Sequence, residues 1–471
     1  MNRTLRLASK VAITALGSLL VSGCMLGPDY QRPEVPEPPT FRGAEGQAQA
    51  ESIADANWST VADDPVLEEL IRVAIANNLD LRTATARVTE ARARYGIAQS
   101  FLYPEVGVNG GYSSQQDSQL ADQPGGVGSG RSYQNWDAAV QVSWELDFFG
   151  RVRRESEAAF SQYLATEQGQ RAVLVSLVGD VASNYLLMRQ LDLELEIAHQ
   201  TVVANEETVR FYRNRLKGGL SNRLELDTAV ANLARTNTLI PQLERQIAVT
   251  ENALSLLLAR PPGPIERGEA LSSRQIPAAI PVGLPAALLE RRPDVQAAEQ
   301  QLVAANARVG AAKALFFPRI SLTGLYGSVS GDFSDLMNND AEVWSVSPSL
   351  FAPVFQGGRI SRNYEASKAV YEQAFSQYQQ AALNGYREVA NALVALRTLG
   401  EARVTLQTGV DALQDAASLS RLRYNAGLAN YLEILNADQQ LFDQRILLAE
   451  TRGEELRALV ELYRALGGGW Q

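Results

Sequence analysis

The chain contains one structural unit that occurs twice. Pro104 and Pro318 lie 214 residues apart, and the same spacing relates, without a gap, the identical pairs Asp80/Asp294, Ala84/Ala298, Ala91/Ala305, Arg94/Arg308, Gly96/Gly310, Gly110/Gly324 and Tyr112/Tyr326. Further along the chain the spacing falls to 208, which relates Trp136/Trp344, Gly150/Gly358, Arg151/Arg359, Gly219/Gly427, Leu220/Leu428 and Asn222/Asn430. Such self-similarity indicates duplication, so both halves are expected to fold alike. We assign 58–270 to the first repeat and 271–471 to the second.

Each repeat is predicted to run in the order helix, two strands, very long helix, turn and helix. Apolar residues at helical spacing cover 66–100, and 285–316 is the counterpart. The strands are expected at about 104–114 and 137–148, and again at about 319–328 and 343–353. The stretches 151–216 and 359–424 contain no proline, so each predicts a helix of roughly 100 Å at 1.5 Å per residue. Returning helices are expected over 221–258 and 429–466.

The first 23 residues have the composition of a secretory signal. Three basic residues precede the apolar run 11–21, which is too short to span a membrane as a stable helix. The segment ends in Val21-Ser22-Gly23-Cys24, which resembles a bacterial lipobox, and Cys24 is the only cysteine. We expect Cys24 to carry a covalent diacylglycerol and an N-linked acyl chain such as palmitate; a chance cysteine beside an ordinary signal is the alternative. The Pro- and Glu-rich segment 24–57 is expected to be an extended tether.

Composition excludes several classes of function. With one His and one Cys, the chain cannot build a multi-ligand His or Cys metal site, a disulfide framework or a Cys/His catalytic pair. A net charge of −10 argues against nucleic acid as a partner. The acidic balance fits either a solvated surface or an acidic lumen that favours cations. Apart from the lipid on Cys24, no cofactor and no metal site is expected.

The predicted strands alternate apolar and polar residues over 139–148, which sends the two kinds of side chain to opposite faces. The loops before the second strand of each pair, 113–135 and 327–342, are rich in Gly, Ser and Asp, as extracellular loops of membrane barrels are. The pattern alone fits a soluble hairpin, whereas the export signal favours a membrane barrel. Four strands cannot close in lipid without unpaired edges, so we expect three copies and a twelve-stranded barrel.

Four segments of the chain resemble the outer membrane factor family, the TolC-like channels, and within it the lipoprotein branch, of the OprM/NodT kind, that serves resistance-nodulation-division (RND) efflux. They are 284–295, which contains Arg291-Arg292-Pro293-Asp294, then 144–151, 316–318 and the carboxyl end 462–470. The resemblance implies an α+β membrane protein, a homotrimer whose β-barrel continues into a long helical barrel in the periplasm. It also implies a periplasmic adaptor and an inner-membrane RND pump as partners. Met25 follows Cys24 in place of the Asp that retains lipoproteins at the inner membrane, so outer-membrane sorting is implied.

The turns at the far ends of the long helices are the expected docking tips for the adaptor. Gly219 and Gly427 permit the left-handed turn between antiparallel helices. The tip residues are Arg215, Gly218, Gly219, Leu220, Ser221, Asn222, Arg423, Tyr424, Gly427, Leu428 and Asn430. A simple helix hairpin without a docking role is the alternative for the outer residues.

The family often narrows its lumen just beyond the second turn with a Leu and, one helical turn later, an Asp. The matching positions are Leu432 and Asn436, so the carboxylate is absent there. Asp438 or Asp227 is the nearby alternative source of charge, unless each is solvated or pairs within a hairpin. Opening is expected to be an untwisting of the hairpins at this end.

The sequence predicts a passive outer-membrane channel of a Gram-negative efflux pump for drugs, toxic compounds or metals, and no enzyme. The alternatives are a duct for secreted polypeptides in type I secretion and a structural lipoprotein that conducts nothing. An enzyme would depend on the carboxylates of Glu145 and Asp147, the one close acidic pair in a persuasive setting.

Overall fold

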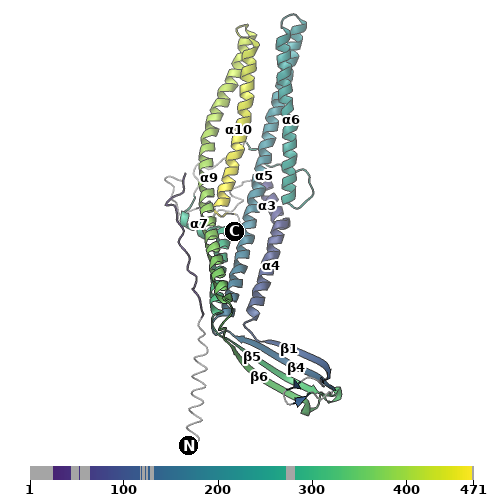
Figure 1. Cartoon of the computed structure of the whole chain (residues 1–471). Helices are drawn as coiled ribbons and strands as arrows, with labels where there is room; N and C mark the ends of the chain where they lie inside the picture. Colours follow the sequence, from purple (N-terminus) through teal and green to yellow (C-terminus); the bar gives the residue numbers. More distant parts are fainter. Residues whose placement is uncertain are drawn as a thin grey trace. The chain divides into compact units, whose positions relative to one another are not determined.

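The computed structural model describes residues 25–43, 52–53, 64–116, 118, 122–123, 126–127, 132–271 and 282–468. The expected signal segment and Cys24 lie outside the described residues. The first repeat contains α3 (Pro65–Asn77), α4 (Leu79–Ser100), β1 (Glu105–Gln116), β4 (Ser132–Leu146), α5 (Arg151–Lys217) and α6 (Arg223–Leu257) (Figure 1). The second contains α7 (Pro285–Arg291), α8 (Pro293–Ala314), β5 (Arg319–Ser330), β6 (Glu342–Phe351), α9 (Arg359–Asn425) and α10 (Tyr431–Ala465).

Shorter elements lie in the two strand-connecting loops. Strands β2 (Asp122–Gln123) and β3 (Gly126–Val127) pair with each other, and the 3-10 turns η3 (Phe333–Asp335) and η4 (Asn339–Ala341) lie between β5 and β6. The chain forms two compact units that do not follow the repeats. Among the described residues, one unit combines 25–33 with those within 88–166 and 298–378, and the other combines those within 34–87, 167–297 and 379–468. Each unit thus takes segments from both repeats.

The first helix of each repeat is broken, where the sequence predicts one continuous helix. The breaks fall at Asn78 and Arg292, which lie 214 residues apart and are therefore equivalent. Pro293 disfavours the helical conformation of the residue before it, and Arg292 is accordingly extended at φ −76° and ψ 118°. Asn78 leaves the helix at φ −55° and ψ 133°, and its side chain accepts a hydrogen bond from Leu81 N, as a helix-capping residue does.

The two break residues also bind equivalent helix ends. Asn78 Nδ2 donates to Leu257 O at 3.0 Å, and Arg292 Nη1 donates to Ala465 O at 2.8 Å. Leu257 ends α6 and Ala465 ends α10, where carbonyls lack a partner within the helix. The duplicated break therefore holds the end of each returning helix in place, and Arg292 gives the Arg-Arg-Pro-Asp sequence a structural role.

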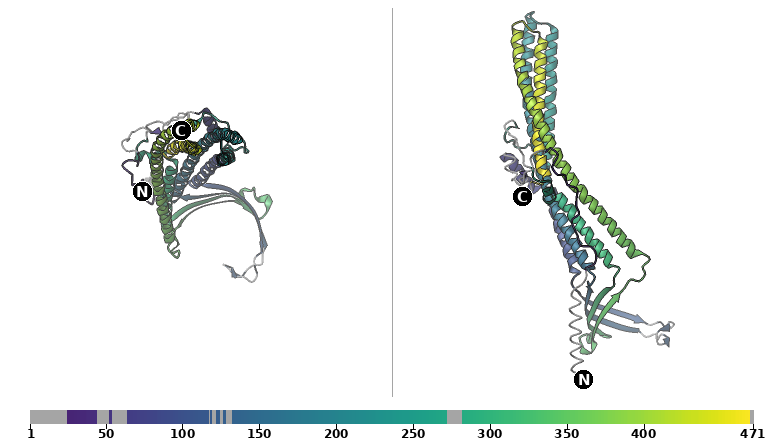
Figure 2. Two further views of the ribbon diagram at one scale, coloured as in Figure 1. Left: turned by 90° about the horizontal axis from the view of Figure 1, so that it is seen from above. Right: turned by 90° about the vertical axis from the view of Figure 1, so that its left-hand side faces the viewer.

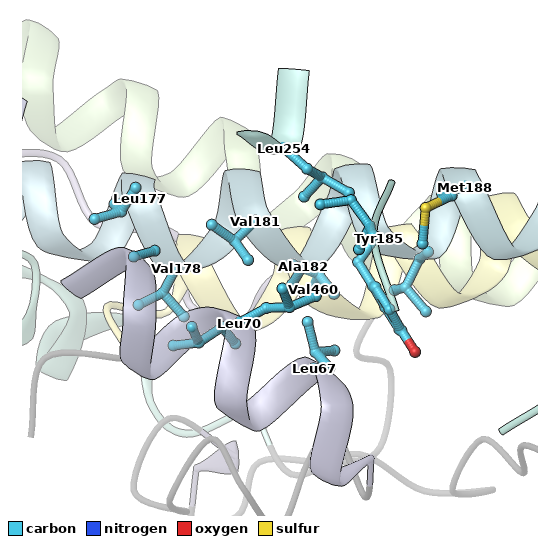
Figure 3. Packing of buried hydrophobic residues seen from close by; sticks show 14 of the residues in the cluster. Leu67, Leu70, Leu177, Val178, Val181, Ala182, Tyr185, Met188, Leu254 and Val460 are labelled. Carbon is cyan, nitrogen blue, oxygen red and sulfur yellow. The ribbon is translucent and has the colours of Figure 1, made fainter. Parts of the chain in front are cut away.

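A hydrophobic cluster of the second compact unit lies where α3 packs on α5. Leu67 and Leu70 of α3 face Val181 of α5 together with Leu254 of α6 and neighbouring residues (Figure 3). Burying each such side chain contributes about 1.5–3 kcal/mol to stability. One window of α5 is long and apolar enough to cross a membrane, the single such helix among the described residues, and half of it is buried in the protein.

The long helices form two antiparallel hairpins, α5 with α6 and α9 with α10, which lie side by side at their tips (Figures 1 and 2). Both α5 and α9 are 67 residues long, and both α6 and α10 are 35. Arg235 Nη2 of α6 donates to the Asp443 carboxylate of α10 at 2.9 Å, and Gln439 donates to Asn232 at 3.0 Å. The two hairpins are thus joined by polar contacts as well as by apolar packing.

Candidate functional site

The four-stranded antiparallel sheet, in the order β1-β4-β5-β6, has one apolar and one polar face. Val106, Val142, Gly324 and Val346 form one cross-strand row, and the adjacent row, Glu105, Ser143, Thr323 and Ser347, points to the other face. The apolar face also carries the row of Val108, Val140, Tyr326 and Trp344, with Val108 79% and Trp344 71% exposed. Leu325 and Val329 of β5 interrupt the polar face. An exposed apolar face of this extent is typical of a surface that contacts lipid or a partner.

The polypeptide turns from strand to helix at equivalent glycines. Gly150 and Gly358 have φ of 75° and 81°, a conformation that side chains with a Cβ disfavour. Beside the first turn, the Glu145 carboxylate accepts two hydrogen bonds from Arg151 at 2.9 Å, and Asp147 accepts one from Arg153 N at 2.8 Å. The two carboxylates of the enzyme alternative are therefore engaged by arginines of α5.

The two tips are built alike. Gly219 and Gly427 have φ of 72° and 76°, so the predicted left-handed turns are present. Asn222 accepts from Glu225 N, and Asn430 accepts from Glu433 N, so both asparagines cap the returning helices. Arg215 donates to Leu220 O at 3.1 Å, and Arg423 donates to Leu428 O at 3.4 Å.

Among the remaining predicted tip residues, Gly218, Leu220 and Leu428 are exposed and Ser221 is half-buried. Leu220 and Leu428 are each 70% exposed. Each tip therefore presents one apolar side chain at the end of a hairpin whose backbone turn is fixed by its own arginine and asparagine.

A tyrosine cluster joins the two hairpins just behind the tips. Tyr212 of α5 is 2% exposed, and its ring lies 4.4 Å from that of Tyr431 on α10 and 6.1 Å from that of Tyr424 on α9. The guanidinium of Arg215 lies 5.4 Å from the Tyr424 ring, a favourable arrangement of a cation over an aromatic face. Burial raises the pKa of Tyr431 to about 12, so this phenol stays neutral at physiological pH.

The candidate constriction residues fall into two groups. Leu432 and Asn436 lie one helical turn apart on α10, and both are exposed, Leu432 by 57%. Asp438 accepts a hydrogen bond from Arg421 of α9 at 2.6 Å, so it pairs within the second hairpin. Asp227 lies 3.4 Å from Arg223 and is exposed. Of the four candidates, Asp438 is therefore the one whose side chain is engaged by the neighbouring helix of its own hairpin, and the other three are exposed on the single chain.

The ionisation of Asp438 should make tip stability depend on pH. Burial raises the pKa of its carboxyl above the ordinary value of 3.8, while Arg421 opposes the rise. A raised pKa means that the stabilising contribution is complete below pH 3.8 and is lost as pH rises through the raised pKa. We expect Asp438→Asn to be at least as stable as the parent at pH 7 and equal to it at pH 3, measured by thermal unfolding. Asp227→Asn is the exposed control; a variant less stable at pH 7 would show that the Arg421 ion pair outweighs burial.

Residues 25–33, here called the strap, follow the candidate lipidation site. Leu26 N donates to Phe149 O at 3.3 Å, and the carbonyl of Leu26 accepts from Arg154 Nε at 3.2 Å. The side chain of Arg154 is 2% exposed and also donates to the Asp29 carboxylate at 2.7 Å. A buried arginine that binds both backbone and side chain fixes this part of the strap beside the turn from β4 to α5.

The second half of the strap lies along α8. Arg32 donates twice to the Glu299 carboxylate, both times at 2.7 Å, and Tyr30 donates to the same carboxylate at 3.1 Å. Asn306 Nδ2 donates to Pro28 O at 2.9 Å. The sequence predicts an extended tether here, but the docking residues Arg154, Glu299 and Asn306 carry no local sequence signal, because all lie more than 100 residues away along the chain.

A pair of equivalent glycines allows a test of strap docking. A Cβ on Gly310 would lie 2.8 Å from Leu26 O and 3.0 Å from Arg154 Nε, whereas a Cβ on Gly96 would meet nothing within 4 Å. Both lie inside helices, where alanine is favoured over glycine by about 1 kcal/mol. We expect Gly310→Ala to speed hydrogen exchange across 25–33 at least fivefold and Gly96→Ala to leave it unchanged. Equal exchange in both variants would show that the strap does not depend on this contact.

The sequence predicts Tyr424 as a tip residue but misses Tyr212 and Tyr431, the other two members of the tyrosine cluster. The cluster departs from the repeat, since Tyr212 corresponds to Ser420 and Tyr431 corresponds to Arg223. The sequence signal for this cluster is therefore the set of positions at which the two halves differ when they are aligned at the 208-residue spacing. Within the described part of the chain, no group of three or more His, Cys, Asp or Glu residues is placed to hold a metal ion.

A duplicated chain with paired 67-residue helices and a two-faced antiparallel sheet defines a TolC-like channel protein of the outer membrane. The family model of outer membrane efflux proteins matches residues 70–260 and 284–468, one stretch in each repeat. The solvent efflux pump outer membrane protein SrpC of Pseudomonas putida is 35% identical over 96% of this chain and 97% of its own length. The cation efflux system protein CusC of Escherichia coli K12 is 34% identical over 96% and 98%.

Solved structures agree with this relationship. The outer-membrane channel OprN superposes with a TM-score of 0.89 at 30% identity over 95% of this chain and all of its own. The open state of the MtrE outer membrane channel of Neisseria gonorrhoeae gives 0.85 at 30% identity over 95% and 99%. The chain belongs to the outer membrane efflux protein family. It is therefore an outer-membrane channel of a tripartite efflux system.

Proposed function

We propose that three copies of this chain form a passive exit duct, with a twelve-stranded barrel in the outer membrane and a helical barrel in the periplasm. The order β1-β4-β5-β6 leaves β1 and β6 at the edges of the sheet, and they run in opposite directions because every neighbouring pair is antiparallel. The β6 edge of one copy can therefore pair with the β1 edge of the next as a further antiparallel pair. Closure in this way removes every edge that lipid would leave unsatisfied.

The two-faced sheet is the observation that carries this proposal. Its exposed apolar face suits the hydrocarbon of a bilayer, and its polar face suits a water-filled lumen. Three copies fit better than two, since an eight-stranded barrel encloses little free space. Transport through the duct follows the work of an inner-membrane RND pump, which reaches the duct through a periplasmic adaptor at the tips.

The strap supports lipidation at Cys24. Leu26 N donates a hydrogen bond to Phe149 O in the turn that follows β4, so a lipid on Cys24 would lie beside the periplasmic end of the barrel. There its acyl chains can enter the inner leaflet of the outer membrane and add reversible anchoring to that of the barrel. We propose a diacylglycerol and an N-acyl chain on Cys24 as the modification.

The substrates that the proposal covers are small toxic compounds. SrpC is named for solvents and CusC for cations, and this chain is similar to both over nearly its whole length. A wide aqueous duct imposes little selection of its own, so the cognate pump would decide whether drugs, solvents or metal cations reach it.

Adjacent residues of β1 give a sharp test of the barrel. Val108 belongs to the apolar face and Asn109 to the polar face. An Arg on a lipid-facing position costs about 2–4 kcal/mol near the membrane midplane. We expect Val108→Arg to abolish heat-stable trimers in outer-membrane fractions, and Asn109→Arg to keep the trimer while lowering its single-channel conductance in planar bilayers. A parent protein that is monomeric and never conducts would overturn the duct and favour a structural envelope lipoprotein.

A further inference from the structure

A cavity of about 540 Å³ lies where the polar face of the sheet meets the first turn of α5. Its walls include Glu105 of β1, Glu145 of β4 and Arg151 of α5, together with Phe101 and Tyr103 from the turn that follows α4. The volume is within the range of small-molecule sites.

The aromatic wall of this cavity is held in place. Trp144 Nε1 donates to Leu102 O at 3.0 Å, between the two aromatic residues. Within the same turn, Leu102 N donates to Gln99 O at 3.1 Å and Tyr103 N donates to Ser100 O at 3.0 Å. Phe101 and Tyr103 are nevertheless 63% and 65% exposed. The rings therefore offer surface for contact without the need for the backbone to rearrange.

One of the two carboxylates that line the cavity has no cationic partner. Glu145 is neutralised by Arg151, which donates to both of its carboxylate oxygens at 2.9 Å. Glu105 has no ion pair and no side-chain hydrogen bond among the residues that the structure describes. Its cross-strand partner on the polar face is Ser143, which carries no charge. A carboxylate beside two exposed aromatic rings is the combination that attracts an organic cation.

The second repeat lacks the two carboxylates and the Phe101 ring at the equivalent place, although Tyr103 corresponds to another aromatic residue, Phe317. Glu105 corresponds to Arg319, Glu145 to Pro353 and Phe101 to Leu315. The Arg319 guanidinium lies 5.4 Å from the centre of the Phe351 ring, so a cation of the chain itself occupies an aromatic face there. The cavity is therefore a feature in which the first repeat has departed from the second, and not a consequence of the shared fold.

We propose that this cavity is a binding site for planar aromatic monocations. The charged nitrogen would lie against Glu105 and the ring system against Phe101 and Tyr103. An adjoining hollow of about 340 Å³ shares Phe101 and Arg151 and is lined largely by alanines of α4 and α5, so it can take the apolar end of a larger ligand. Arg308 and Glu155 border that hollow and contribute one positive and one negative charge. The excess negative charge of the two adjoining hollows is therefore that of Glu105.

The site rests on the proposed duct, because the polar face lines a lumen only if the barrel closes. In the assembled trimer it would recur three times around the base of the barrel. Each copy would hold cationic substrates briefly between the helical barrel and the exit and would raise their local concentration there. Neutral solvents would pass without this contact.

The test is an equilibrium titration of the full-length trimer in lipid nanodiscs with ethidium, followed by fluorescence anisotropy. Loss of one close charge contact, about 1.4 kcal/mol, corresponds to a tenfold weaker affinity. We expect Glu105→Gln to raise the Kd for ethidium about tenfold and Phe101→Leu to raise it several-fold. Naphthalene-2-sulfonate, an aromatic anion, should show no saturable binding to the parent.

Asp137→Asn is the matched control, because Asp137 is another acid on the polar face of β4 and lies outside the cavity. An unchanged affinity in this control, with the loss confined to Glu105→Gln and Phe101→Leu, supports a discrete site. Equal losses in Asp137→Asn and Glu105→Gln would overturn it in favour of a diffuse field of luminal charge, and unchanged affinity in all variants would overturn it outright. Because binding is read without ion flow, a failure of the duct appears separately, as a missing conductance.

Discussion

Replacing Arg292 with alanine is expected to destabilise the helical hairpins by about 1.5–3 kcal/mol, the usual contribution of hydrogen bonds to a charged group. The Arg292 side chain is 8% exposed and lies 2.7 Å from the Asp294 carboxylate and 2.8 Å from that of Glu388 on α9. It also donates to Ala465 O at the end of α10. Its loss would leave this carbonyl without its side-chain donor and would leave the Glu388 carboxylate with only Arg387, at 3.9 Å. The measurement is the midpoint of thermal unfolding followed by circular dichroism.

Two further variants give this prediction its controls. Arg387 neighbours Glu388 at 3.9 Å but is 63% exposed, so Arg387→Ala should change stability by less than about 1 kcal/mol. Arg292→Asn places the residue of the first repeat, Asn78, at the equivalent position and should recover part of the loss through the helix-end carbonyl. Equal effects of Arg292→Ala and Arg387→Ala would contradict the role assigned to the buried guanidinium.

Replacing Tyr212 with alanine is expected to loosen the junction of the two hairpins and to raise single-channel conductance several-fold. Truncation of a fully buried aromatic side chain costs about 3–5 kcal/mol. Tyr212 contacts both α9 and α10 through Tyr424 and Tyr431, so its loss acts on the contact that must change if the hairpins separate during opening. Conductance in planar bilayers and thermal unfolding would be measured on the same preparation.

Leu432→Ala separates the effect of opening from that of stability. Because Leu432 is 57% exposed on its own chain, its truncation should leave thermal unfolding nearly unchanged. A rise in conductance with this variant requires that copies of the chain meet at Leu432. Val203→Ala, on an exposed position of α5, should change neither quantity. If Tyr212→Ala lowered stability and left conductance as it was, the tyrosine cluster would be structural only and opening would lie elsewhere.

Much of the fold follows from local sequence. Strands β1 and β5 begin one residue after Pro104 and Pro318, because proline ends the preceding helix and restrains the residue before it. The long helices end within one residue of the predicted positions, since Gly219 and Gly427 supply left-handed turns. The four predicted strands are present as β1, β4, β5 and β6. Because the unit is duplicated, each of these elements is encoded by two segments of the chain.

The breaks in the first helix of each repeat could not be predicted from hydrophobic periodicity. The apolar stripe continues through Asn78 and through Arg292, so the hydrophobic pattern gives no sign of either break. Pro293 is a local signal for the second break, but the first depends on Asn78 reaching Leu257 O, 179 residues along the chain. A side chain that caps a distant helix end depends on a tertiary contact, so helix propensity along the sequence does not predict the break.

The sequence by itself determined the duplicated unit, the order and length of its elements, the two-faced strands and the left-handed tips, because each follows from spacing or from the backbone preferences of single residues. The tertiary structure decided which residues of the two halves meet. It placed Tyr212 against Tyr431, Arg154 under the strap and Arg292 at the end of α10, and it brought Glu145 and Arg151 to the cavity that Phe101 and Glu105 also line. These contacts join residues far apart in the chain, and only the packing of complete elements brings them within reach.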